Sequence, residues 1–161
     1  MQLVRHDDQL AIISSYGACA LIGIGPFAVY RFATGNLLAA ALDLGIVVLI
    51  CLAVAHSWRG GRREQSTLVL AIVNTVGCLA SATVLGPPGL FWMYPALLGN
   101  FLLLDRGKAV AMTAFAFLFL VVQGKAYESN TQLAMFLVTA TVSGLVAFVF
   151  ASRTERQRKA L

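Results

Sequence analysis

Long runs without a charged residue constrain the fold of this sequence more than any other feature. The clearest run covers residues 133–151, LAMFLVTATVSGLVAFVFA, which contains nineteen residues and no charge. At 1.5 Å per residue, a helix of this length crosses the ~30 Å hydrocarbon core of a bilayer. The chain is 59% hydrophobic and only 12% charged, which is too apolar for a water-soluble domain. The sequence therefore predicts an all-α, polytopic membrane protein that has the lipid bilayer as its main partner.

Short polar segments divide the chain into six predicted spans, which form a bundle of six transmembrane helices. The spans cover approximately residues 10–32, 37–58, 67–85, 90–104, 109–122 and 133–151. The turn sequences ATGN and GPPG follow the first and third spans, and DRGK follows the fourth. The fourth span is short, so a re-entrant segment is the alternative to a full crossing. Residues 1–151 then form one membrane domain, and residues 152–161 extend the last helix into the cytoplasm.

Basic residues are distributed unevenly between the predicted loops. If both termini are cytoplasmic, the inner segments hold ten Lys and Arg residues, and the outer segments hold only Arg31 and Lys125. Cytoplasmic loops carry an excess of Lys and Arg, so this asymmetry predicts that both termini lie inside. The cations alternate with membrane segments and form no single basic face, which argues against nucleic acid as a partner.

The sequence contains no recognisable catalytic or metal-binding motif. Its cysteines, Cys19, Cys51 and Cys78, are scattered through apolar runs without a CxxC pair. His6 and His56 fall near the predicted inner face, which argues against a haem held inside the bilayer. No Ser/His/Asp set, carboxylate pair or phosphate-binding glycine loop is present. We therefore expect no catalytic residue, no metal and no cofactor.

Asp43 is the only ionisable residue well inside a predicted span. A carboxylate there costs about 2.5–3.5 kcal/mol on insertion scales unless it is protonated, paired or hydrated. If successive spans are antiparallel, five other residues lie at about the same depth in the membrane as Asp43: Ser81, Thr83, Trp92, Tyr94 and Gln123. One hypothesis is an outward-facing ligand cavity in which Asp43 is the polar anchor. The alternatives are a structural hydrogen bond between helices for Asp43 and an interfacial aromatic belt for Trp92 and Tyr94.

The last span is predicted to continue as a helix beyond the membrane. Residues 152–161, SRTERQRKAL, contain four cations and one anion, and no Gly or Pro follows Ser152. An uncharged stripe with heptad spacing runs through this exit; its members are Ser143, Ala147, Phe150, Thr154, Gln157 and Leu161. Small residues four positions apart, such as Ala140 and Gly144, permit close helix approach, either within the bundle or to a partner.

We expect this helix to relay a signal through the stripe from Ala147 to Leu161 and to form a homodimer. The alternative is an ordinary span that ends in a basic cytoplasmic stop.

Residues 91–104, FWMYPALLGNFLLL, and the following DRGKAVAM resemble the N-terminal membrane sensor regions of bacterial diguanylate cyclases. Many of those regions contain an aromatic-Tyr-Pro motif, an FFLL run and a short charged turn. They end in a helix rich in Arg and Glu, similar to SRTERQRKAL. The resemblance covers residues 91–161, and the first three spans match only as hydrophobic helices. Related six-helix anchors also precede adenylate cyclase and histidine kinase domains.

The resemblance implies a MASE-like sensor in the bacterial inner membrane that signals to a dimeric GGDEF domain. This chain contains no GGDEF sequence, so it is either the sensor portion of a longer protein or a stand-alone relic. No cyclase activity, nucleotide binding or Mg²⁺ site is expected in these residues.

The combined observations favour a signal-input and dimerisation module that responds to an unknown small or lipophilic ligand. The alternative from a different class is a small transporter or channel-like protein that works around Asp43. A passive membrane anchor is the third hypothesis. One buried acid would suit a proton-coupled carrier, but the paired broken helices typical of such carriers are missing.

Overall fold

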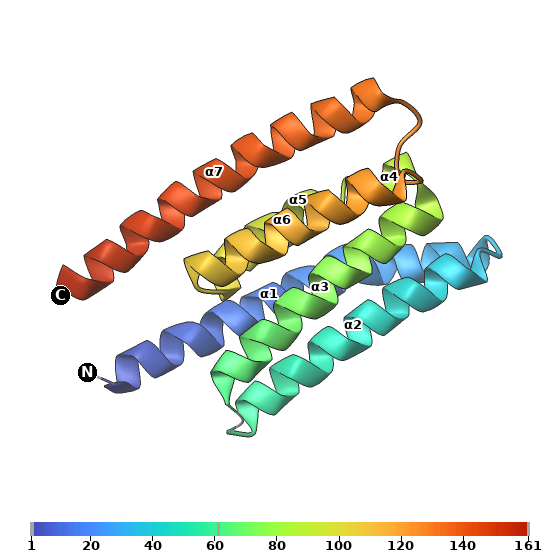
Figure 1. Ribbon diagram of the computed structural model, residues 1–161. Helices are drawn as coiled ribbons and strands as arrows, with labels where there is room; N and C mark the ends of the chain where they lie inside the picture. The colour runs from blue at the N-terminus through green and yellow to red at the C-terminus, as the bar shows by residue number, and fades with distance from the viewer. Residues whose placement is uncertain (1, 61, 161) are drawn as a thin grey trace.

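The computed structural model describes residues 2–60 and 62–160, and within these ranges it contains helices and no strands (Figure 1). The all-α prediction is therefore confirmed. The helices are α1 (Gln2–Ala33), α2 (Leu37–Trp58), α3 (Arg63–Leu85), α4 (Pro87–Leu90), α5 (Met93–Leu103), α6 (Arg106–Gln123) and α7 (Asn130–Ala160).

Five of these helices contain a segment that is long and apolar enough to cross a bilayer. The segments are Leu10–Ala33, Leu37–Trp58, Glu64–Leu85, Arg106–Gln123 and Asn130–Ser152. They coincide with five of the six predicted spans. Together they indicate a multi-pass membrane protein.

The predicted fourth span, residues 90–104, is divided into two helices. Gly86 ends α3 with a φ of 66°, and the chain resumes as the four-residue α4 at Pro87. Proline suits the first turn of a helix because the amide that it lacks would have no partner there. A turn at Phe91 and Trp92 precedes α5, whose 11 residues extend about 16 Å at 1.5 Å per residue. The predicted fourth span is thus interrupted at Phe91 and Trp92, and neither helix alone is long enough to cross the hydrocarbon core.

Several other helices begin earlier than the sequence predicted, whereas the predicted extension of α7 beyond Ser152 is present. The polar lead before Leu10 is already helical from Gln2, and α3 begins at Arg63 rather than at residue 67. The loop between α2 and α3 is therefore short. Helix α1 also continues through Pro26. Helix α7 extends without a break through Ser152 to Ala160.

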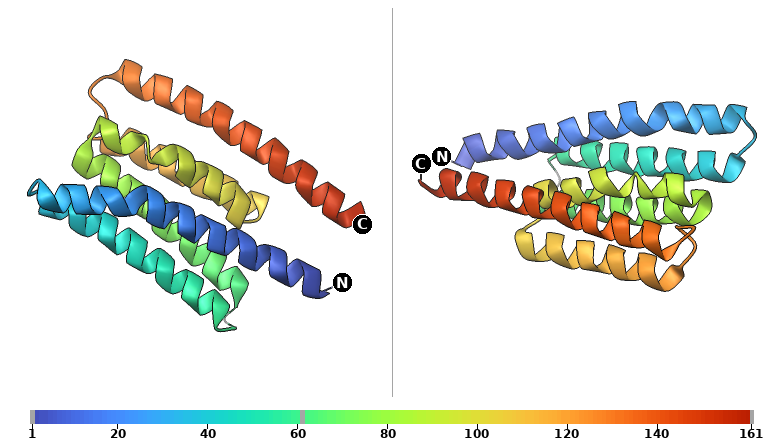
Figure 2. Two further views of the ribbon diagram at one scale, coloured as in Figure 1. Left: turned by 180° about the vertical axis from the view of Figure 1, so that it is seen from behind. Right: turned by 90° about the horizontal axis from the view of Figure 1, so that it is seen from above.

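Helices α1, α2, α3, α5, α6 and α7 lie side by side, and each runs opposite to the one before it in this series (Figures 1 and 2). The beginning of α1 and the end of α7 consequently lie at the same end of the bundle. Tight turns make this arrangement possible. Gly35 and Gly124 adopt φ values of 81° and 66° at the turns after α1 and α6, and the Asn36 side chain caps α2.

Helices α3 and α5 occupy the centre of the bundle. Helix α3 packs against α2, α4, α5 and α6, and α5 packs against α3, α6 and α7. Two apolar clusters meet here, one shared with α1 and α2 and the other with α6 and α7. Gly89 of α4 lies against α3 so closely that a Cβ there would be 2.5 Å from the Ser81 carbonyl oxygen. The position of α4, and hence the start of α5, is fixed by this backbone contact.

Candidate functional site

Asp43, the predicted anchor of a ligand cavity, forms a buried ion pair. The Arg31 guanidinium of α1 donates to its carboxylate with an Nη1–Oδ2 distance of 2.5 Å. The two side chains are only 12% and 5% exposed, respectively. Arg31 also lies 5.9 Å from the centre of the Phe27 ring, one turn earlier on α1. The carboxylate therefore has a charged partner within the protein.

Prediction from sequence identified Asp43 but not its partner. Arg31 lies 12 residues earlier, across the turn between α1 and α2, and the predicted topology puts it in an outer loop. A long arginine side chain can extend back along a helix while its charged group reaches a polar partner at another depth. An acid and a base that flank one hairpin turn were therefore the signal in the sequence for this pair.

The other predicted ligand residues have separate surroundings. Thr83 donates to the Ala80 carbonyl of its own helix at 2.7 Å, and Ser81 is buried beneath α4. The Trp92 ring packs edge-on against Phe27 at a centroid distance of 5.4 Å. Gln123 has a buried Oε1 atom without a hydrogen-bond partner. Thr83 and Trp92 are therefore engaged in local contacts, and the shared cavity remains a prediction.

A polar pair joins the two central helices. The Thr75 hydroxyl of α3 donates to Oδ1 of Asn100 on α5 at 3.3 Å and accepts from its Nδ2 at 3.0 Å. Both residues are fully buried. One turn further along α3, the Cys78 thiol donates to the Trp92 carbonyl at 3.3 Å. These hydrogen bonds pair buried polar groups of α3 with Asn100 of the short helix α5 and with the Trp92 carbonyl that precedes it. They therefore hold α5 against α3.

Among the described residues, no three His, Cys, Asp or Glu side chains lie close enough together to hold a metal ion. Cys19 and Cys51 are exposed on different helices, whereas Cys78 is buried.

Helix α7 is attached to the bundle near its beginning by a cluster around Tyr94. The Tyr94 hydroxyl lies 2.5 Å from the Thr139 hydroxyl, and the Thr139 oxygen also lies 2.8 Å from the Met135 carbonyl oxygen. Phe136 packs edge-on against Tyr94 of α5 and Phe117 of α6, with centroid distances of 5.4 and 6.4 Å. Tyr94 therefore connects α5 to α7.

A second attachment lies nearer the end of α7. Phe148 packs edge-on against Phe101 of α5 at a centroid distance of 6.1 Å. The Arg106 guanidinium lies 5.9 Å from the centre of the Phe148 ring. Its Nη2 atom is also 3.5 Å from the Ser152 carbonyl oxygen. The first turn of α6 thus contacts α7 close to the start of its charged tail.

The predicted relay stripe lies beside these attachments. Ala147 is half-buried and Phe150 is 66% exposed. The side chains of Thr154 and Gln157, and Leu161 as a whole, lie outside the described residues. The small residues Ala140 and Gly144 are buried, and Gly144 lies against Phe101 of α5. This small-residue pair therefore serves packing within the bundle.

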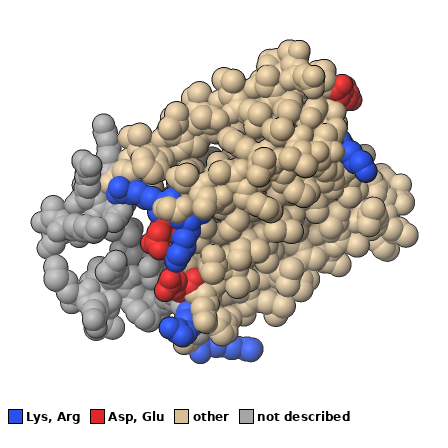
Figure 3. Space-filling view, in the orientation of Figure 1, with Lys and Arg blue, Asp and Glu red and all other residues tan. Residues whose placement is uncertain are grey.

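Apolar side chains cover the outside of the bundle between its two ends. Exposed valine, leucine and phenylalanine residues occur on all five long helices. Figure 3 shows that the described charges on the displayed face lie near its two ends and leave a broad uncharged region between them. Such a surface suits contact with lipid chains.

No protein-family model, curated protein or solved structure matches this chain.

Proposed function

We propose that this chain is a membrane-embedded signal-input and dimerisation module that passes a signal through α7 to a cytoplasmic output domain. The continuity of α7 carries the proposal. Its 31 residues extend about 46 Å at 1.5 Å per residue, whereas the hydrocarbon core needs ~30 Å. The excess is the charged segment after Ser152, which continues the same helix. A rotation or shift of α7 in the membrane would therefore move whatever is attached beyond it.

We propose that both termini lie in the cytoplasm of a bacterial cell and that the chain crosses the inner membrane six times. The opposite directions of successive helices support this topology, with α4 and α5 supplying the fourth crossing. The distribution of charge also supports it. At the end of the bundle that holds the termini, Arg59 follows α2, Arg62 precedes α3, and Lys108 lies in the first turn of α6. The positive-inside rule assigns this end to the cytoplasm.

The way in which α7 is held suits a movable connection. It contacts α5 along one face and α6 only slightly, and most of its membrane segment is exposed. Polar and aromatic contacts from Tyr94 and Phe101 of α5 hold it in place. Phe117 and Arg106 of α6 add further contacts. A ligand or membrane state that alters α5 would therefore reach α7 directly.

The mechanism is an equilibrium between two packings of the bundle. A ligand shifts such an equilibrium only if it binds the two packings with different affinity. The resulting change in α7 is a rotation, a shift along its axis or a change in crossing angle. In a dimer, any of these motions changes the distance between two output domains.

We propose a GGDEF diguanylate cyclase as the output domain, because of the resemblance of residues 91–161 to the sensor regions of such enzymes. No catalytic role falls to the residues of this chain. The ligand is a small or lipophilic molecule of unknown identity.

The proposal is tested by fusing a GGDEF domain after Leu161 and inserting one to four residues at the junction. Each inserted residue rotates the output domain by about 100°, so cyclase activity should vary periodically with insertion length. A seven-residue insertion, which restores the heptad phase, is the matched control and should recover most of the activity. Constant activity across the series would contradict transmission through the helix and favour a passive anchor.

A further inference from the structure

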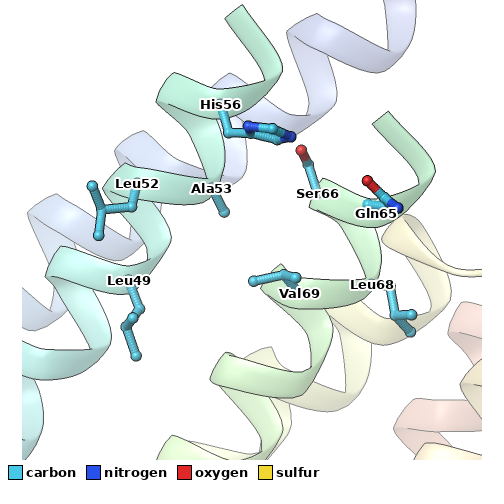
Figure 4. Close-up of a pocket in the computed structure, with 8 residues that line it drawn as sticks. All are labelled: Leu49, Leu52, Ala53, His56, Gln65, Ser66, Leu68 and Val69. Atoms are coloured by element: carbon cyan, nitrogen blue, oxygen red, sulfur yellow. The ribbon is translucent and has the colours of Figure 1, made fainter. Parts of the chain in front are cut away.

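A groove of about 510 Å³ lies between α2 and α3, near the end of the bundle where a short loop joins them (Figures 1 and 4). Its walls have two distinct parts. The apolar part includes Leu49, Leu52 and Val69, which are 48%, 60% and 44% exposed and face away from the bundle core. The polar part, nearer the loop, consists of His56, Gln65 and Ser66.

The polar part contains an unsatisfied hydroxyl. Ser66 is 2% exposed, and its Oγ atom has no hydrogen-bond partner. Figure 4 shows that this hydroxyl points from α3 toward the imidazole of His56 on α2, which is exposed. Buried polar atoms are nearly always hydrogen-bonded in proteins, so an unpaired hydroxyl beside an exposed imidazole indicates a missing polar partner.

The charge around this part of the groove is positive. Arg59 and Arg62 in the loop between the two helices are both exposed. Helix α3 begins here without a side-chain cap on its first amides, and such a helix terminus favours anions. The acid Glu64 in the first turn of α3 accepts from Lys108 of α6 at 3.0 Å.

We propose that this groove binds one anionic glycerophospholipid. One of its acyl chains lies along Leu49, Leu52 and Val69. Its phosphate contacts His56 and Ser66, and Arg59 and Arg62 lie in the adjoining loop. A groove that is apolar along its length and basic at one end matches an amphiphile with an anionic headgroup. A soluble anion would leave the apolar part unused, and an uncharged lipid would leave the arginines unused. The inference extends beyond signal relay and holds for any role of a protein that spans the membrane here.

The first experiment locates the lipid. The photoreactive residue p-benzoylphenylalanine replaces Leu52 in the groove or, as a control, Leu118 of α6, which is 64% exposed. The protein is reconstituted in equal parts phosphatidylglycerol and phosphatidylcholine and irradiated. We expect adducts at position 52 to be enriched in phosphatidylglycerol by about fivefold over those at position 118, since one cation near a membrane surface contributes about that factor. Equal lipid composition at the two positions would overturn the proposal.

The second experiment tests the polar contacts. Arg59→Gln with Arg62→Gln should abolish the roughly fivefold preference for phosphatidylglycerol over phosphatidylcholine, as measured by native mass spectrometry. Ser66→Ala should weaken retention of phosphatidylglycerol without reducing the free energy of unfolding, because the hydroxyl has no partner in the protein. The control, Arg153→Gln with Arg156→Gln, removes the same charge from the tail of α7. Equal losses in the two double variants would show diffuse attraction and no site.

Discussion

The membrane segments of α3 and α7 are about equally apolar, but they have opposite surroundings. Half of the α3 segment is buried within the bundle, compared with 22% of the α7 segment. Helix α3 has neighbours on several sides, whereas α7 rests on α5 along one face. The comparison shows that hydropathy identifies a membrane helix without indicating whether it is a structural centre or a peripheral element.

The difference lies in the contacts between helices. Helix α3 carries Thr75 and Cys78, whose side chains bond to α5 and to Trp92. It also receives Gly89 at backbone contact distance. Helix α7 has aromatic contacts at two positions and an exposed apolar row on the other side; the row is Met135, Val138, Val142, Leu145 and Val149. Changes near α3 should therefore alter stability, and changes on the exposed face of α7 should alter association.

The largest expected effect is at the ion pair on the α1–α2 side of the bundle. Asp43→Asn leaves the buried guanidinium of Arg31 without a countercharge. Removing one partner of a buried pair costs about 3–5 kcal/mol, which we expect as a loss of unfolding free energy in detergent. The paired variant, Asp43→Leu with Arg31→Met, should recover most of the loss because no charge remains unpaired.

This substitution also separates a structural role from transport. If Asp43→Asn retained full stability but abolished the uptake of a solute into vesicles, the carboxylate would have a transport function instead.

A smaller effect is expected where α4 meets α3. In Gly89→Ala the new Cβ would lie 2.5 Å from backbone atoms of Ser81 and Ala82, which have little room to move. Overpacking of this kind costs about 1–3 kcal/mol. Gly45→Ala is the matched control, since no atom lies within 4 Å of its Cβ position. Equal thermal stability of the two variants would mean that α4 is not held in contact with α3.

The polar pair between α3 and α5 should contribute less. Thr75→Val, Asn100→Leu and the double variant form a thermodynamic cycle whose coupling energy we expect to be about 0.6 kcal/mol, and no more than about 1.7 kcal/mol. The cycle is measured by unfolding in mixed detergent micelles. A coupling energy of zero would leave apolar packing as the sole link between these helices.

The sequence was sufficient to predict the long helices because each contains an apolar run of membrane length. It was also sufficient for the extension of α7, since residues 152–160 contain strong helix formers. The division of the fourth span was harder to predict. GPPG indicated a break, but the proline at position 87 begins a new helical turn within a segment that is too short to cross alone.

Contacts between helices could not be read from residue type. Asp43 was conspicuous as a buried acid, but its pairing with Arg31 depends on how far one side chain extends along α1. Likewise, Ala140 and Gly144 predicted a close helix contact without revealing the partner. The structure assigns that contact to α5, through Phe101. Spacing along one helix specifies a face, and only the packed structure shows what covers it.

The smallest effect on stability is expected on the exposed face of α7. Leu145 is 60% exposed, so Leu145→Ala should change the unfolding free energy by less than about 0.5 kcal/mol. If α7 forms the dimer contact that we propose, its exposed positions should nevertheless approach those of a second copy. In a background without Cys19, Cys51 and Cys78, Leu145→Cys should then form a disulfide between copies in the membrane under mild oxidation.

Two further cysteine positions sharpen this test. Ala140→Cys is the buried control, because position 140 faces α5 and should remain uncross-linked in a folded protein. Phe150→Cys probes the relay stripe that was predicted from heptad spacing, which lies on a different side of α7 from Leu145. Stronger cross-linking at 150 would assign the dimer contact to that stripe, and stronger cross-linking at 145 would assign it to the exposed apolar row. Absence of cross-linking at both positions, with Leu145→Cys and Phe150→Cys stably folded, would remove α7 as a dimer interface and leave it a helix that faces lipid.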